Sequence, residues 1–471
     1  MTFTSSVFFI FFWIFFVLYF ALGKKKFWQN LLTVAASYLF YGWWDLRCLG
    51  LIIASTLIDF ILARCVEKHP HRGKAWVTIS VVVNLTFLGF FKYYNFFVDS
   101  FAELATSLGL EAANLHLNIV LPIGISFYTF HSLSYIVDLY RKEMKASREF
   151  LDFAAYVAFF PQLVAGPIGR GTQLIPQFQT PRTFDYDRAR SGAREALWGI
   201  LKKVVFADNF AIVVNFLYAD ALSRNGATLL FAHICFAFQI YCDFSAYSNI
   251  ARGISRILGI ELMVNFNKPY IAQSVSDFWK RWHISLTTWF RDYVYISIGG
   301  NRKGTYRTQF NIMAVFLLSG IWHGANWTFL AWGALHGCYF AFEKFIGSFA
   351  WIRRWNPPGI TVVRIVVTFS AVVLAWIYFR ATSIEQANAI VAKVLTDFRI
   401  DDFIYVIESY PGVSFAIPLI YGLELLPIHE RHDFDIANWP LLARWSSYVV
   451  IAICILAYSA REESTFIYFQ F

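Results

Sequence analysis

Residues 319–327 read SGIWHGANW and lie near the middle of residues 308–342, a stretch without a single Asp, Glu, Lys or Arg. An uncharged apolar stretch of this length predicts two consecutive membrane segments, at about residues 310–322 and 327–342. An ionisable side chain is costly to keep at membrane depth, so its presence there indicates a functional role by default. His323 is therefore the first candidate for chemistry.

The composition of the whole chain agrees with a membrane protein. Of the 471 residues, 58% are hydrophobic and only 15% are charged, whereas soluble domains carry about 25% charged residues. Apolar segments recur from one end to the other, which predicts an all-α polytopic membrane protein with one domain over residues 1–471. The net charge of +9 is explained by cytoplasmic loops rich in Lys and Arg and by anionic lipid, rather than by nucleic acid.

The apolar segments predict roughly ten or eleven membrane segments, some of them too short to cross alone. Twelve apolar stretches can be read, at about residues 7–22, 31–44, 49–63, 76–91, 119–139, 210–218, 229–247, 310–322, 327–342, 361–379, 415–426 and 448–458. The estimate of membrane segments is lower because the shortest stretches are expected to be tilted, half-inserted or interfacial. The first is followed by three lysines and lacks a cleavage site, so we expect a retained helix rather than a signal peptide. The six cysteines are scattered singly, without the spacing of a metal site, and no metal is expected.

A further apolar segment, residues 150–168, has basic residues on both sides and contains Pro161, Gly166 and Pro167. Proline removes a backbone donor and clashes with the preceding helical turn. The segment is therefore predicted to be re-entrant or broken into half-helices. Such backbone is tolerated at membrane depth only inside protein or beside water, which indicates a central funnel.

Residues 276–293 form the second informative stretch. Aromatic and aliphatic side chains recur at helical spacing from Phe278 to Tyr293, whereas Lys280, His283 and Arg291 fall on the opposite face. With Ser276 as the predicted N-cap, this pattern indicates an amphipathic helix lying in the membrane interface. An interfacial anchor without catalytic function explains everything here except the histidine.

His283 and His323 together suggest acyl transfer to a hydroxyl group, if the fold brings them together. A buried histidine stays neutral and can accept a proton from the hydroxyl, and Lys280, Arg281 and Arg291 can hold the phosphates of an anionic donor. Gly320 and Gly324 flank His323 and would allow close approach of another helix or of a thioester tail. The alternative for His323 is a neutral core histidine bonded to a neighbouring helix.

Six motifs follow one another along the chain. They are residues 124–141 (GISFYTFHSLSYIVDLYR), 160–168 (FPQLVAGPI), 241–248 (YCDFSAYS), 278–286 (FWKRWHISL), 298–302 (IGGNR) and 322–327 (WHGANW). In this order they resemble the membrane-bound O-acyltransferase family, and within it the bacterial alginate O-acetyltransferase branch. His131, Asn249 and Arg252 differ from the residues usual in that branch.

The resemblance implies a multi-pass enzyme of the bacterial inner membrane. It would move an acetyl group from cytoplasmic acetyl-CoA across the membrane, for O-acetylation of a polysaccharide such as alginate, usually through a periplasmic acetyltransferase-like partner. His323 would be the general base and His283 would orient the donor or the oxyanion, with an acyl-histidine intermediate as a variant. No bound cofactor is expected. The weaker candidates for binding donor or substrate are Lys280, Arg281, Arg291, Asn326 and Asp243, and for Asp243 a structural role is favoured.

Two other classes of function stay open from the sequence. A transporter or flippase would line a path with the same polar groups, but neither a nucleotide-binding loop nor an internal repeat is present. A scaffold subunit would only recruit a periplasmic acetyltransferase. Alginate, cellulose, another exopolysaccharide and peptidoglycan all remain possible acceptors.

Overall fold

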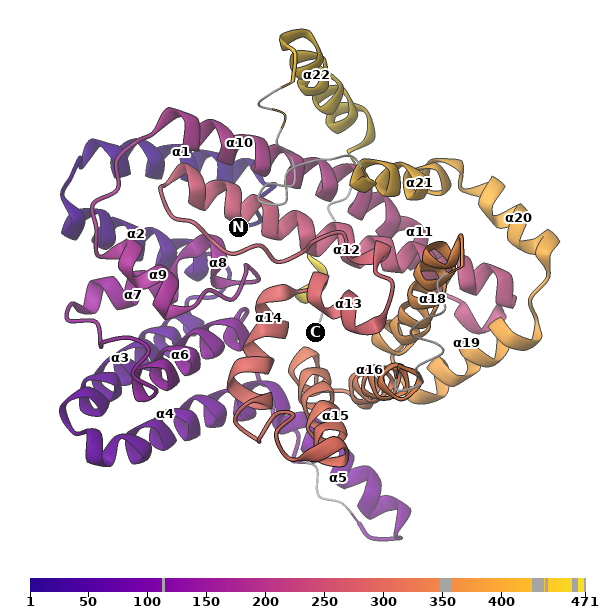
Figure 1. Cartoon of the computed structure of the whole chain (residues 1–471), viewed down its shortest axis with the longest axis horizontal. Coiled ribbons are helices and arrows are strands. Elements are labelled where there is room, and N and C mark those ends of the chain that lie inside the picture. The colour runs from indigo at the N-terminus through magenta and orange to yellow at the C-terminus, as the bar shows by residue number, and fades with distance from the viewer. Residues whose placement is uncertain (112–114, 348–356, 426–435, 437–438, 460–464, 470–471) are drawn as a thin grey trace. The chain divides into compact units, whose positions relative to one another are not determined.

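The computed structural model describes residues 1–111, 115–347, 357–425, 436, 439–459 and 465–469. Every regular element in these ranges is a helix, which confirms the all-α prediction (Figure 1). The chain divides into two compact units, and the two helices α10 (Tyr186–Leu201) and α12 (Gly226–Ile257) each contribute to both. Unit 1 comprises Met1–Ala193 and Ala251–Met263, and unit 2 comprises Arg194–Ile250 and Val264–Phe471. The single domain stays a prediction.

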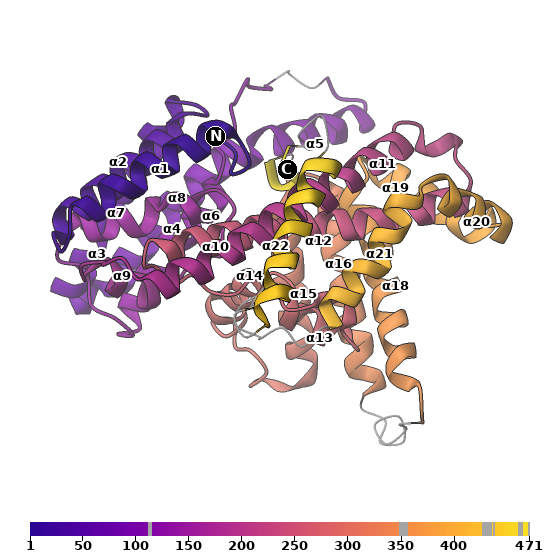
Figure 2. The ribbon, with the colours of Figure 1, turned by 90° about the horizontal axis from the view of Figure 1, so that it is seen from above.

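Unit 1 contains a bundle in which α3, α4 and α6 pack against one another, as Figures 1 and 2 show. Its elements are α1 (Ser6–Ala21), α2 (Lys26–Gly42), α3 (Arg47–Lys68), η1 (Pro70–Arg72), α4 (Gly73–Leu88), η2 (Gly89–Tyr93), α5 (Tyr94–Ser107), α6 (Ile125–Tyr140), α7 (Phe150–Ala158), α8 (Phe160–Leu163) and α9 (Gly171–Phe178).

The predicted break in residues 150–168 is confirmed within unit 1. Helix α7 ends at Ala158, Phe159 leaves the helical conformation, and α8 runs for only four residues with Pro161 in its first turn. A proline in the first turn loses no helical hydrogen bond, which explains why the second half-helix begins there. Both half-helices are buried in protein, where such backbone is tolerated.

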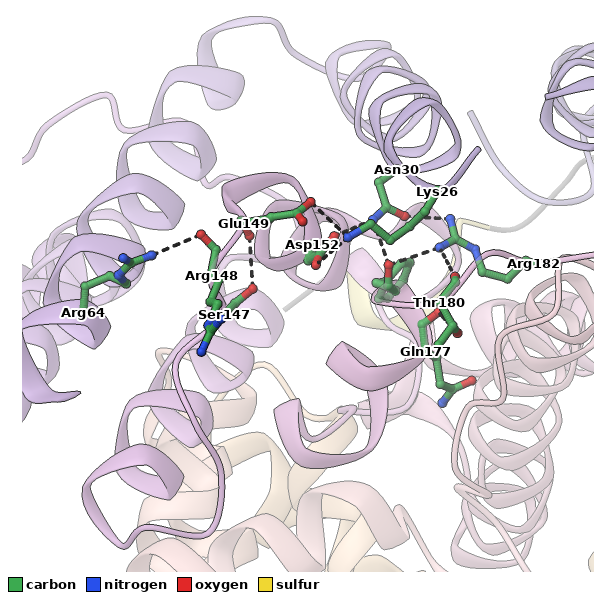
Figure 3. Close-up of polar contacts among 11 residues, drawn as sticks. Lys26, Asn30, Arg64, Ser147, Arg148, Glu149, Asp152, Gln177, Thr180 and Arg182 are labelled. Atoms are coloured by element: carbon green, nitrogen blue, oxygen red, sulfur yellow. Dashed lines mark hydrogen bonds and ion pairs between the residues drawn. The ribbon is translucent and has the colours of Figure 1, made fainter. Parts of the chain in front are cut away.

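A buried polar network joins the start of α2 to α7 and to the chain after α9 (Figure 3). Asn30 donates to Asp152 at 2.8 Å and accepts from the Arg182 guanidinium at 2.6 Å. Lys26 pairs with Asp152 at 3.4 Å, and Arg182 also donates to the Tyr19 hydroxyl at 2.7 Å. Each of these charged groups therefore has an opposite charge or a hydrogen-bond partner, and the network holds the segments in place.

Unit 2 is built around a hairpin of α15 and α16, with α18 packed against α16. Figures 1 and 2 both show α16 and α18 side by side. The elements of this unit are η3 (Lys202–Ala207), α11 (Asp208–Tyr218), η4 (Ala221–Ser223), η5 (Pro269–Ile271), α13 (Val275–Arg281), α14 (Ile284–Trp289), η6 (Phe290–Tyr295), α15 (Gly304–His323), α16 (Trp327–Ile346), α18 (Ile360–Arg380), α19 (Ile384–Thr396), α20 (Ile400–Ser409), α21 (Pro411–Leu425), α22 (Leu441–Tyr458) and η7 (Ile467–Phe469).

Five described stretches are long and apolar enough to cross a membrane. They are Arg47–Lys68, Pro70–Ser107, Gly226–Ile257, Ile360–Arg380 and Leu441–Tyr458, and the pair α20 and α21, bent by 93°, can form a sixth. The other apolar segments predicted from the sequence are shorter or more polar. Helix α1, for example, has 16 residues. The predicted segment 415–426 corresponds to α21 up to Leu425, and its last residue lies outside the described residues.

Candidate functional site

His323 is the last residue of α15, at the turn into α16, rather than in the middle of a membrane helix. The two helices approach closely here. A Cβ on Gly320 would lie 2.3 Å from the Phe329 carbonyl oxygen, and one on Gly324 would lie 2.1 Å from the Phe329 ring. The predicted close approach at both glycines is thus confirmed, because only glycine fits at these two positions. The hairpin fixes the backbone on both sides of His323.

Aromatic rings surround the His323 imidazole. Trp322 and Trp332 lie 5.0 Å from it between ring centroids, and Phe379 at the end of α18 lies at 5.2 Å. Only 4% of His323 is exposed. An imidazole in such surroundings is shielded from water, which favours its neutral form and slows hydrolysis of an activated acyl group beside it.

His283 lies at a break in the predicted interfacial helix. The chain forms α13, leaves the helix at Trp282, takes a left-handed conformation at His283 with φ of 43°, and continues as α14 and η6. The prediction of one continuous helix with His283 on its polar face is therefore wrong, because a left-handed residue cannot continue a right-handed helix. The N-cap is Ser274, not Ser276, and its side chain accepts from the Asp277 amide. Phe278, Trp282, Leu286 and Trp289 are buried as predicted.

Asn265 orients the His283 ring. The His283 Nδ1 lies 3.1 Å from the Asn265 Oδ1, which also accepts from the Ser285 hydroxyl at 2.9 Å. Since an amide oxygen accepts only, Nδ1 of His283 carries the proton and Nε2 is left with its lone pair. Nε2 has no hydrogen-bond partner in the described part of the chain. Burial lowers the pKa of His283 to about 3, so the ring is neutral at physiological pH.

The last described residues of the chain lie against both histidines. The Tyr468 ring lies 5.8 Å from the ring of His323 and 6.3 Å from that of His283, and it packs on Phe244 of α12 at 4.3 Å. Trp322 also contacts both histidines, at 5.0 and 6.0 Å. Figure 1 shows this segment, in yellow, beside α12. Unit 2 therefore gathers two imidazoles and a phenol in one aromatic cluster.

The three predicted phosphate-binding cations do not belong to this cluster among the described contacts. Lys280 is exposed. Arg281 pairs with Asp277 at 2.8 Å, and Arg291 pairs with Asp292 at 2.7 Å with 60% of its side chain exposed. Lys280 and Arg291 are thus exposed, and Arg281 is partly exposed with 30% of its side chain accessible.

Asn326 and Asp243, the other two predicted binding residues, make contacts within the protein. Asn326 is the N-cap of α16, where its side chain accepts from the Thr328 amide at 2.9 Å and donates to the Thr382 carbonyl at 3.1 Å. Asp243 pairs with Lys203 at 2.9 Å and accepts from the Ile467 amide at 2.7 Å.

Asn265 and Tyr468 were not among the residues predicted from the sequence. The family motif that includes His283 starts 13 positions after Asn265, and nothing in the spacing connects the two. Tyr468 lies in the segment FIYFQF at residues 466–471, whose density of aromatic residues was the only available signal. Among the described residues, no group of three or more His, Cys, Asp or Glu is arranged to hold a metal ion.

Comparison with known proteins supports the same assignment. The model of the membrane-bound O-acyltransferase family matches residues 142–385. The chain is 39% identical to the probable alginate O-acetylase AlgI of Pseudomonas putida, over 100% of both chains. The chain belongs to the membrane-bound O-acyltransferase family. It is also 30% identical to the peptidoglycan O-acetyltransferase of Helicobacter pylori, over 96% of this chain and 93% of that protein. With the teichoic acid D-alanyltransferase of Bacillus subtilis it shares 29% identity, over 56% and 69% of the two chains.

Membership in this family establishes the general activity. The protein is an O-acyltransferase, and its apolar helices make it a multi-pass membrane protein. The resemblance inferred from the six motifs is confirmed.

Proposed function

We propose that this protein accepts an acetyl group from acetyl-CoA at the cytoplasmic face of the bacterial inner membrane and delivers it across the membrane for O-acetylation of a polysaccharide such as alginate. A periplasmic acetyltransferase-like partner would complete the transfer to the sugar. The observation that carries this proposal is that the Tyr468 ring lies against the rings of both His283 and His323 in unit 2. The alginate O-acetylase and peptidoglycan O-acetyltransferase relatives favour acetyl and a polymer acceptor.

In the proposed reaction His323 is the general base and the Tyr468 hydroxyl is the first acceptor. The imidazole takes the phenolic proton while the phenol oxygen attacks the thioester carbonyl, and a new C–O bond forms. The C–S bond then breaks, and the leaving thiolate takes the proton back from His323. The products are an acetyl ester of Tyr468 and free coenzyme A. His283, neutral and fixed by Asn265, orients the reacting group.

A tyrosyl ester is a suitable carrier because it keeps the acetyl group activated. A phenol has a pKa of about 10 and a thiol about 8.5, so the phenolate leaves an ester nearly as readily as a thiolate leaves a thioester. Transfer from Tyr468 to the much less acidic hydroxyl of a sugar is therefore favourable. The surrounding rings of Trp322, Trp332 and Phe379 exclude the water that would otherwise hydrolyse the ester.

The donor and acceptor would approach from different surfaces. Lys280, Arg281 and Arg291 are available to the phosphates of acetyl-CoA, since they lie at the protein surface. The bulky aromatic side chains beside His323 favour a short acyl group such as acetyl. The acceptor is bound by the partner in this proposal, so the polymer is chosen outside this chain.

The test compares two buried histidines of unit 2 in the purified protein. With labelled acetyl-CoA, His323→Gln is expected to reduce thioester turnover by about 100- to 10,000-fold, the usual contribution of a general base. His233→Gln is the matched control, because His233 is equally buried but bonded to the Tyr218 hydroxyl and to the Leu229 carbonyl. Unchanged turnover in His323→Gln would refute the base assignment. A transporter would release intact acetyl-CoA, and a scaffold would show no turnover even in the unmodified protein.

A further inference from the structure

A buried ion cluster lies where the end of the chain meets α12. Lys203 pairs with Asp208 at 2.8 Å and with Asp243 at 2.9 Å. Only 12% of the lysine side chain and 3% of each carboxylate side chain are exposed. Burying three charged groups costs free energy that their mutual attraction does not necessarily recover, so such a cluster often serves a purpose other than stability.

Asp243 also binds the C-terminal segment, by which we mean the described residues 465–469. The second oxygen of the Asp243 carboxylate accepts the Ile467 backbone N–H at 2.7 Å. Ile467 is 2% exposed and Phe466 is 6% exposed, with the Phe466 ring 4.9 Å from that of Tyr247. The next residue is Tyr468, so the hydrogen bond to Asp243 fixes the backbone directly before the phenol that contacts both histidines.

We propose that Asp243, held by Lys203, is a positioning residue that seats the C-terminal segment so that the Tyr468 phenol lies against His323. The inference rests on the function proposed above, to which it adds the device that places the acceptor hydroxyl. Asp243 acts through the backbone of the segment and touches no reacting atom. The positive charge of Lys203 favours the ionised carboxylate of Asp243 and fixes its rotation, and Asp208 is the second partner of the lysine.

The roles of Asp243 and Asp208, the two carboxylates paired with Lys203, can be distinguished by substitution. Both carboxylates are equally buried and both pair with Lys203, but Asp243 is the one whose hydrogen bond to the C-terminal segment is described. In Asp243→Leu the lysine keeps Asp208 as its partner, so the unit should still fold. Asp208→Asn is therefore the matched control. A second pair of variants changes the donor of this hydrogen bond instead of the acceptor. Ile467→Pro removes the backbone N–H and leaves the ion cluster unchanged, whereas Ile467→Val keeps the N–H.

Two readouts on the full-length protein in lipid nanodiscs test the proposal. Amide hydrogen exchange of the C-terminal peptide, followed by mass spectrometry, reports whether the segment is seated. A hydrogen bond to a charged group corresponds to about a 10- to 100-fold change in an equilibrium constant. Exchange of this peptide should therefore be about 10- to 100-fold faster in Asp243→Leu and change little in Asp208→Asn. Turnover of acetyl-CoA should show a lower kcat with an unchanged KM in Asp243→Leu and Ile467→Pro, and Ile467→Val should behave like the unmodified protein.

The outcomes decide between positioning and a general structural role. Faster exchange in Asp243→Leu together with a selective loss of kcat in Ile467→Pro supports the proposal. Unchanged exchange in Asp243→Leu overturns it, and so do equal effects of Asp208→Asn and Asp243→Leu on both readouts. Amide exchange does not depend on acetyl transfer. It therefore shows whether Asp243 seats the C-terminal segment even if Tyr468 does not carry the acetyl group.

Discussion

The polar network of unit 1 and the histidine cluster of unit 2 use buried polar groups in opposite ways. In the network, Asp152 is bonded to Asn30 and paired with Lys26, and the Arg182 guanidinium has several acceptors around it. In the cluster, His283 and His323 are surrounded mainly by aromatic rings, and Nε2 of His283 has no partner among the described residues. The first arrangement satisfies polar groups, whereas the second leaves a reactive nitrogen available.

This difference separates stability from chemistry. A buried charge with complete hydrogen bonding holds segments together, and its loss leaves the other members unsatisfied. A neutral imidazole with one ring nitrogen left for chemistry, such as Nε2 of His283, is ready to exchange a proton. Substitutions in the two regions should therefore change different measured quantities.

The largest expected effect is a loss of stability when the polar network of unit 1 is broken. Arg182→Leu should destabilise the protein by about 1–3 kcal/mol for each buried group that loses its partner, and both Asn30 and the Tyr19 hydroxyl do. The folded fraction that survives heating in detergent, measured by size-exclusion chromatography, should fall. Turnover per folded molecule should stay unchanged. A variant that folds normally but has lost turnover would contradict the separation between the two regions.

Loss of the residue that orients His283 should reduce turnover without unfolding the protein. Asn265→Ala should lower kcat by about 10- to 100-fold, the usual effect of removing a partner that orients an active-site histidine. Asn267→Ala, on the same segment but without contact to His283 among the described hydrogen bonds, serves as the control. If both variants lose turnover equally, the orientation of His283 by Asn265 does not matter for the reaction.

The stability of the protein should depend on pH through His283. Its pKa is lowered to about 3 by burial, whereas the unfolded chain titrates near 6.5, so the unfolded state binds more protons between these values. Stability is therefore full above about pH 6.5 and falls as the pH drops, by up to about 1.4 kcal/mol per pH unit. His283→Gln should flatten this dependence. Identical pH profiles of unfolding in the two proteins would show that His283 is not held neutral.

The smallest effect is expected at Asn326. Because its side chain caps α16, Asn326→Ala should cost about 1 kcal/mol of stability. Asn326→Ser should recover most of this loss, since serine is a comparable cap. The KM for acetyl-CoA should be the same in all three proteins. A raised KM in both variants would instead support the sequence-based prediction that Asn326 binds donor or substrate.

Local patterns in the sequence predicted much of the fold. Pro161 marks the break between α7 and α8, and the spacing of Phe278, Trp282 and Leu286 identifies a buried face. Steric and hydrophobic effects of this kind act over a few residues, so one sequence is enough to read them. The number of membrane spans was harder to predict from the sequence. By length and composition, only five or six of the described stretches can cross a membrane.

The candidate site depended on contacts that no local pattern contains. The left-handed backbone at His283 occurs because Asn265 binds both the ring and the residues that follow it, from outside the amphipathic segment. Tyr468 reaches His323 from the other end of the unit's sequence, through a hydrogen bond between Ile467 and Asp243. The resemblance to a family identified the two histidines as a pair, but it did not indicate the tyrosine.

The proposed role of Tyr468 as acceptor is tested most directly by mass spectrometry of the C-terminal peptide after a single turnover with labelled acetyl-CoA. We expect an acetyl group on Tyr468 in the unmodified protein, and none in Tyr468→Phe or His323→Gln. Label on His323 instead would indicate the acyl-histidine variant. If Tyr468→Phe supports polymer acetylation in cells at the rate of the unmodified protein, Tyr468 is not the acceptor of the acetyl group.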